Sequence, residues 1–172
     1  GAIARERMRG PLGPGALIRI QAAGRPDAPA LADGDRRLSY GQLDLRVGRL
    51  ARSLREGLGI APKTAVAIVL KNRLETIEAQ AALGRIGASA VSASYRSTDA
   101  EIEYLLRHSG ARAVVTEPDL YDVVARAAER AGLGRDGIVV ASEGEPVPSG
   151  SVSYDSLVER GGLVQRQQHE SG

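Results

Sequence analysis

Apolar and polar positions follow two patterns along this chain, one typical of buried strands and one typical of amphipathic helices. Short runs of consecutive apolar residues predict strands that are covered on both faces. Four such runs occupy residues 65–70, 88–93, 111–116 and 137–141. Between the runs, apolar residues recur every three or four positions, which predicts helices that pack on a sheet.

The spacing of the four runs indicates how the strands are connected. Their centres lie 23, 23 and 25 residues apart, counted between Ile68, Val91, Val114 and Val139. Repeating strand–helix units of this length favour a parallel sheet with right-handed crossovers. Upstream, residues 30–32 and 37–39 flank an Asp-Gly turn, which predicts a hairpin. We therefore predict an α/β fold: an open, mainly parallel sheet with flanking helices in Rossmann-like layers, preceded by a small β-hairpin.

Helix starts are marked by a Ser, Thr or Asn three residues before a Gln or Glu, as in a capping box. Three pairs fit this spacing: Ser39 with Gln42, Asn72 with Glu75, and Thr98 with Glu101. A helix candidate at residues 16–23 precedes the hairpin, and residues 153–159 predict a short last helix. The predicted organisation is a loose segment at 1–14, one α/β subdomain at 15–160 and a loose tail at 161–172.

The amino-acid composition excludes several kinds of chemistry for this chain. The chain of 172 residues is 42% hydrophobic, 26% charged and 3% aromatic, which suits one globular domain with an aliphatic core. It has no Cys and two His, which excludes disulfides and thiol chemistry and disfavours a histidine metal site. The net charge of +2 is spread along the helices, so we expect no nucleic-acid partner. No apolar run approaches the ~18 residues of a membrane span, and residues 1–10 lack the apolar core of a signal peptide, so a cytoplasmic location is expected.

Four ordered segments carry a family resemblance. They read LSYGQL at 38–43, VLKNR at 69–73, LGRIGA at 83–88 and TDAEIEYLLRHSGAR at 98–112. Each is weak alone, but their order and spacing over roughly residues 16–160 resemble the opening of the AMP-forming acyl- and aryl-CoA synthetases. These enzymes activate a carboxylic acid with ATP as an acyl-adenylate, with release of pyrophosphate, and then transfer the acyl group to CoA or a carrier thiol, with release of AMP.

The resemblance implies a parent enzyme that uses ATP, Mg and CoA, but most of that machinery has no counterpart in this sequence. The family's phosphate loop is rich in Ser, Thr and Gly and ends in Pro-Lys-Gly, whereas the Gly-rich stretch at 10–15 has no Lys, Ser or Thr. Neither of the two lysines, Lys63 and Lys71, stands in a comparable motif. We therefore expect no catalytic residue, no metal site and no cofactor in the isolated chain.

Arg96 is the one candidate ligand-binding residue. It follows the second predicted strand, at the carboxyl edge where α/β folds bind ligands. In the family, an Arg in this loop approaches the CoA nucleotide phosphates, so the resemblance implies that contact here. The structural alternative is a surface salt bridge with Asp99 or Glu101. The loop itself departs from the family, because Ser92-Ala93-Ser94 replaces the frequent Pro-Val-Asn or Pro-Leu-Asn.

Two classes of function remain open. The chain is the N-terminal part of an acid–CoA ligase, completed by the remainder of the synthetase or by a complementary chain. Alternatively, it is a non-catalytic truncated paralogue that serves as an interaction or dimerisation module for a synthetase or carrier protein. A homodimer is compatible with both.

Overall fold

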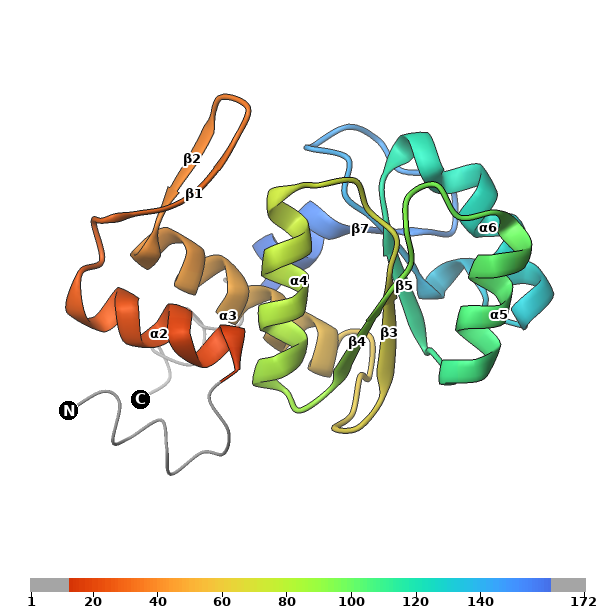
Figure 1. The fold of residues 1–172 in the computed structure, drawn as a ribbon, viewed down its shortest axis with the longest axis horizontal. Coiled ribbons are helices and arrows are strands. Elements are labelled where there is room, and N and C mark those ends of the chain that lie inside the picture. Colours follow the sequence, from red (N-terminus) through yellow and green to blue (C-terminus); the bar gives the residue numbers. More distant parts are fainter. Residues whose placement is uncertain (1–12, 162–172) are drawn as a thin grey trace.

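The computed structural model describes residues 13–161, so nearly all of the predicted loose ends at 1–14 and 161–172 lies outside the described residues. The described part of the chain begins with helix α2 (Pro14–Gly24), hairpin strands β1 (Pro29–Asp33) and β2 (Arg36–Ser39), and helix α3 (Tyr40–Glu56) (Figure 1). This confirms the predicted first helix and hairpin. Gly34 has a φ of +56°, the left-handed conformation that an Asp-Gly turn supplies at little cost.

A five-stranded parallel sheet forms the centre of the molecule. Its strands are β3 (Ala65–Ile68), β4 (Ser89–Ser92), β5 (Ala113–Thr116), β6 (Ile138–Val140) and β7 (Val152–Ser153), in the order β4-β3-β5-β6-β7. All four neighbouring pairs are parallel, which confirms the predicted sheet. Strand β7 was not predicted, because a strand of two residues is too short to show an alternation of apolar and polar positions.

Helices cover both faces of the sheet. Helix α4 (Leu74–Arg85) lies on one face with α3, and α5 (Asp99–Ser109) and α6 (Tyr121–Ala131) lie side by side on the other (Figure 1). Two 3₁₀ turns, η1 (Pro118–Leu120) and η2 (Arg135–Gly137), precede α6 and β6, and residues 154–161 are helical. No helix within residues 13–161 is long and apolar enough to cross a bilayer.

The alternation of side chains along each strand divides the core in two. Val66 and Ile68 of β3 pack with α3 and α4, whereas Ala67 and Val69 pack with α5 and α6. All four are no more than 2% exposed. Burial on both faces is why these strands are continuous apolar runs rather than alternating ones.

Two of the three predicted capping boxes form. Ser39 with Gln42 and Thr98 with Glu101 each satisfy two backbone N–H groups reciprocally. The third prediction, Asn72 with Glu75, is wrong: the N-cap of α4 is Arg73, and its side chain makes no capping bond.

The α4 N-terminus is capped instead from a distant part of the chain. Asp33 Oδ2, at the tip of the hairpin, accepts the Leu74 N–H at 3.2 Å. Glu75 is 1% exposed and binds two guanidiniums, so its carboxylate is not free to turn back to the helix start. A buried carboxylate gains more from charged donors than from one backbone amide.

Candidate functional site

The strand order defines a topological switch point. From β3 the chain crosses through α4 to β4 on one side, and from β4 it crosses back through α5 to β5 on the other side of β3. The loops that follow β3 and β5 therefore diverge, and open α/β sheets bind ligands in the crevice that this divergence creates. We take this carboxyl edge as the candidate functional site.

Ion pairs occupy the switch point. The Lys71 backbone N–H donates to Glu117 Oε2 at 2.9 Å, and Lys71 Nζ lies 2.6 Å from Asp119 Oδ2 and 3.6 Å from Glu117 Oε1. The hydrogen bond from Lys71 lowers the pKa of Asp119, and the same bond raises the pKa of Lys71. Glu117 itself is only 4% exposed, so this lysine offsets a largely buried charge.

A second group of ion pairs continues along the edge to the hairpin. Arg73 Nη2 lies 2.6 Å from Glu143 Oε1 in the loop after β6, and Arg73 Nε lies 3.2 Å from Glu75 Oε2. Arg36 of the hairpin binds the same Glu75 at 2.6 Å.

These contacts shift the titration of the groups involved. Burial raises the pKa of Glu75, but the hydrogen bond from Arg36 and the Arg73 charge outweigh it, and the net pKa is lowered. The hydrogen bond with Glu75 in turn raises the pKa of Arg36. Lys71, Arg36 and Arg73 are therefore already engaged by carboxylates and are poorly placed to neutralise an incoming anion.

Arg96 differs from these cations. Its guanidinium lies 5.4 Å from the centre of the Tyr95 ring, and its Nε donates to the Tyr95 hydroxyl at 3.2 Å. The predicted alternative, a salt bridge with Asp99 or Glu101, is wrong. The Asp99 carboxylate pairs with Arg126 and Arg130 on α6, and the Glu101 carboxylate is held by Thr98. Within residues 13–161, no carboxylate pairs with the exposed Arg96.

Glu78 forms a buried cluster with Arg46 and Tyr154 between α3, α4 and the last helix, and the sequence analysis did not predict it. Glu78 is 0% exposed; its Oε2 accepts the Tyr154 hydroxyl at 2.9 Å and an Arg46 N–H at 3.1 Å. Burial, followed by the nearby Glu78 charge, raises the pKa of Tyr154 well above its usual value. The available signal was the i, i+3 spacing of Glu75 and Glu78 inside the apolar stripe of α4.

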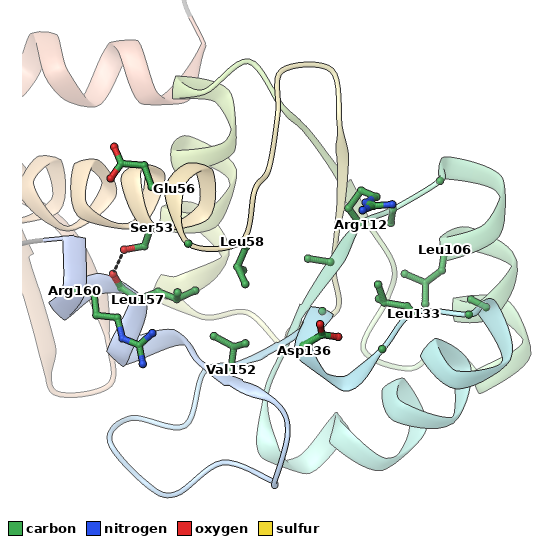
Figure 2. A pocket seen from close by; sticks show the side chains of 18 of the residues that line it. Ser53, Glu56, Leu58, Leu106, Arg112, Leu133, Asp136, Val152, Leu157 and Arg160 are labelled. Carbon is green, nitrogen blue, oxygen red and sulfur yellow. Dashed lines mark hydrogen bonds between the residues drawn. The ribbon is translucent and has the colours of Figure 1, made fainter. Parts of the chain in front are cut away.

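The opposite, amino edge of the sheet carries a hollow of about 1170 Å³. Leu58, Leu133 and Val152 line it together with Arg112 and Arg160, and the Ser53 hydroxyl donates to the Leu157 carbonyl at its wall (Figure 2). No pattern in the sequence predicts this hollow. It lies where the strands begin, at the edge away from the usual ligand crevice of parallel sheets.

The described residues offer little to the cofactors that the resemblance implies. Among residues 13–161, no group of three or more His, Asp or Glu side chains could hold a metal ion. Lys71, Arg36 and Arg73 at the carboxyl edge are each paired with carboxylates of the described residues. The guanidinium of Arg96 is exposed, and within residues 13–161 it contacts the ring and hydroxyl of Tyr95 but no carboxylate.

An open parallel sheet with helices on both faces and a switch point between β3 and β5 is the fold of a nucleotide- or cofactor-binding α/β domain. The chain belongs to the AMP-binding enzyme family, whose model matches residues 18–170.

The relatives that this chain resembles include CoA ligases and a peptide synthetase. The chain is 32% identical over 136 residues to a 3-oxocholest-4-en-26-oate–CoA ligase from Rhodococcus rhodochrous, with 77% of this chain and 24% of the relative covered. It is 36% identical over 138 residues to a phosphinothricin tripeptide synthetase from Streptomyces viridochromogenes, covering 80% of this chain and 11% of the synthetase. A benzoate CoA ligase structure from Burkholderia xenovorans LB400 superposes with a TM-score of 0.75 at 26% identity, covering 87% of this chain and 28% of that chain.

The chain thus spans between 11% and 28% of the length of these three relatives.

Proposed function

We propose that this chain is the N-terminal scaffold of an AMP-forming carboxylic acid–CoA ligase. The parent reaction joins a carboxylic acid to ATP as an acyl-adenylate and then transfers the acyl group to CoA. The observation that carries the proposal is the family match across residues 18–170 on a sheet with the required switch point. In this role the chain supplies a rigid parallel sheet, and the rest of the enzyme supplies the groups that bind ATP.

The isolated chain is catalytically inert under this proposal. Phosphoryl and adenylyl chemistry needs positioned cations around the phosphates. In the described residues, Lys71, Arg36 and Arg73 are neutralised by Glu117, Asp119, Glu75 and Glu143.

The test is acid-dependent exchange of labelled pyrophosphate into ATP, measured with the purified 172-residue chain and a panel of aliphatic and aromatic acids. We expect no exchange above the protein-free background. Exchange that depends on both the acid and the chain would overturn the inert assignment.

Arg96 is the contact that we assign to CoA. Its guanidinium lies at the carboxyl edge, on the loop that follows edge strand β4, and no carboxylate within residues 13–161 competes for it. A planar guanidinium is well suited to a phosphate, since it can donate two parallel hydrogen bonds.

A non-catalytic interaction module is the second candidate. The ion pairs at the switch point favour this candidate. They join Lys71 to Glu117 and Asp119, so the charged groups at the edge where a ligand would bind are already paired with one another. The exchange assay does not separate these candidates, but CoA binding through Arg96 supports only the first.

A further inference from the structure

A tight turn lies shortly after strand β6. The Glu145 N–H donates to the Ser142 carbonyl at 3.1 Å, and the two residues between them have positive φ angles, +56° at Glu143 and +89° at Gly144. Turns with two positive φ angles normally take Gly, Asn or Asp at the central positions, because the left-handed region is costly for other side chains. The turn therefore does not explain why residue 143 is a glutamate.

The side chain of Glu143 binds two arginines. Its Oε1 lies 2.6 Å from Arg73 Nη2 and 3.7 Å from Arg36 Nη2. Arg73 Nη1 also donates to the Ala141 carbonyl at 3.2 Å, which fixes the guanidinium against the end of β6. The Glu143 carboxylate thus occupies a position that holds an anion, and this contact accounts for a glutamate in the turn.

The other carboxylates near Arg73 are buried. The Glu75 side chain is 2% exposed and lies 3.2 Å from the Arg73 guanidinium. The Glu117 side chain is 6% exposed, lies 3.9 Å from the same guanidinium and is also paired with Lys71. The Glu143 side chain is 55% exposed. Of these three carboxylates, Glu143 is therefore the one that an anion from solvent can replace.

An anion from solvent meets the same charges as Glu143. Arg36 and Arg73 carry two positive charges. Asp33 and Glu75 carry two negative charges and stay bound to these arginines when Glu143 leaves. The four groups are neutral together, and the Glu143 carboxylate adds one negative charge to them. A phosphate or a carboxylate in its place adds charge of the same sign, and a guanidinium donates hydrogen bonds to either one.

We propose that Arg73 and Arg36 form a binding site for a small oxyanion, a phosphate or a carboxylate, and that Glu143 is an internal anion that the ligand displaces. The contact is autoinhibitory, because the ligand binds when the Glu143 side chain turns out to solvent. That rotation leaves the backbone bond that closes the turn intact. All groups of the site lie between residues 33 and 143, Arg96 is not among them, and the site does not depend on the proposed ligase role.

The test is the affinity of the 172-residue chain for inorganic phosphate, pyrophosphate and acetate, by NMR titration of the isotope-labelled chain at constant ionic strength. Glu143→Gln removes the internal anion, and we expect about tenfold tighter binding, as for a competitor that fills the site about nine-tenths of the time. Amide shifts should fall at residues 73–75 and 141–144. Tighter binding of the phosphates assigns a phosphoryl ligand, and tighter binding of acetate assigns a carboxylate.

The matched control is Glu145→Gln, which removes the same charge from the same turn. Glu145 is exposed and, within residues 13–161, pairs with no arginine, so this variant should bind like the wild type. Glu143→Gly also removes the carboxylate and suits the left-handed conformation, so it should fold at least as well as the wild type and share the gain in affinity.

Arg73→Lys in the Glu143→Gly background tests the guanidinium itself. An ammonium group keeps the charge but not the planar pair of donors, so part of the gain should be lost. Equal affinities of Glu143→Gln and Glu145→Gln would overturn the proposal, and so would a gain whose amide shifts lie away from residues 73–75 and 141–144. The two Glu143 variants decide the outcome if Arg73→Lys fails to fold.

Discussion

Two buried glutamates on α4 bind arginines from other parts of the chain and so link several elements of the fold. Glu75 and Glu78 lie one turn apart on α4 and are 1% and 0% exposed. Helix α4 lies between α2, α3 and the sheet, and most of its residues are buried or half-buried. A carboxylate tolerates that position only when charged donors reach it, and Arg36, Arg73 and Arg46 do so from other elements.

Removing the Glu78 carboxylate should be among the most damaging single changes. Glu78→Ala leaves the buried Tyr154 hydroxyl and the half-buried Arg46 without their partner, and we expect a loss of about 3–5 kcal/mol in the free energy of unfolding. Urea denaturation measures it.

The control for this loss is Glu103→Ala, which removes a surface ion pair with Arg107 and should cost less than about 1 kcal/mol. Comparable losses for the two variants would contradict a special role for the buried cluster.

At the scale of elements, two of the three local capping signals predict the structure, whereas contacts between distant parts of the chain leave no pattern in the sequence. The boxes at Ser39 and Thr98 were predictable, because both partners lie within four residues of each other. The cap of α4 was not, because Asp33 lies 41 residues from Leu74. The position of the Arg96 loop at the carboxyl edge could also be predicted, because the loop directly follows a strand. The bond between Lys71 and Glu117 could not, because the two residues are 46 positions apart and no local sequence pattern links them.

The cap on α4 gives a clear comparison of two variants. Asp33→Ala should destabilise the protein by about 0.5–2 kcal/mol, the usual cost of losing an N-cap. Asn72→Ala should stay within about 0.5 kcal/mol, since Asn72 is exposed and makes no cap. Thermal or urea unfolding of both variants at neutral pH checks the order, and a larger effect at Asn72 would contradict the structure.

The same cap should depend on pH. The Leu74 N–H, and then Arg36, lower the pKa of Asp33 below its usual 3.8. A carboxylate with a lowered folded pKa contributes stability that is complete above the unfolded value and is lost as pH falls through the folded value. The stability difference between the wild type and Asp33→Ala should therefore be constant above about pH 5 and shrink toward pH 2.

At the scale of the whole molecule, the two edges of the sheet offer two places for a ligand. The carboxyl edge has the switch point and the exposed Arg96, and the amino edge has the hollow of about 1170 Å³. Volume alone would favour the hollow. Parallel sheets bind at the carboxyl edge because helix starts and diverging loops meet there, so we favour Arg96.

Titration of CoA into the isotope-labelled chain, followed by NMR, distinguishes the two edges. We expect amide shifts at residues 93–98 and none at residues 111–113. Arg96→Gln should weaken binding roughly tenfold, as expected for the loss of a charge-assisted hydrogen bond. Arg112→Gln, at the hollow, is the matched control and should bind like the wild type; shifts confined to the hollow would refute the assignment.

The contact between Tyr154 and Glu78 also constrains how the protein is synthesised. The two residues are 76 positions apart, and the Ser53 hydroxyl is bound by the Leu157 carbonyl across 104 positions. A ribosome therefore synthesises all five strands of the parallel sheet, β3 to β7, before the Tyr154 phenol that donates to Glu78 leaves the exit tunnel. Until then, the nascent chain cannot close α4 against the sheet without leaving Glu78 short of a donor. Stable closure of α4 should thus wait until residues 154–161 emerge.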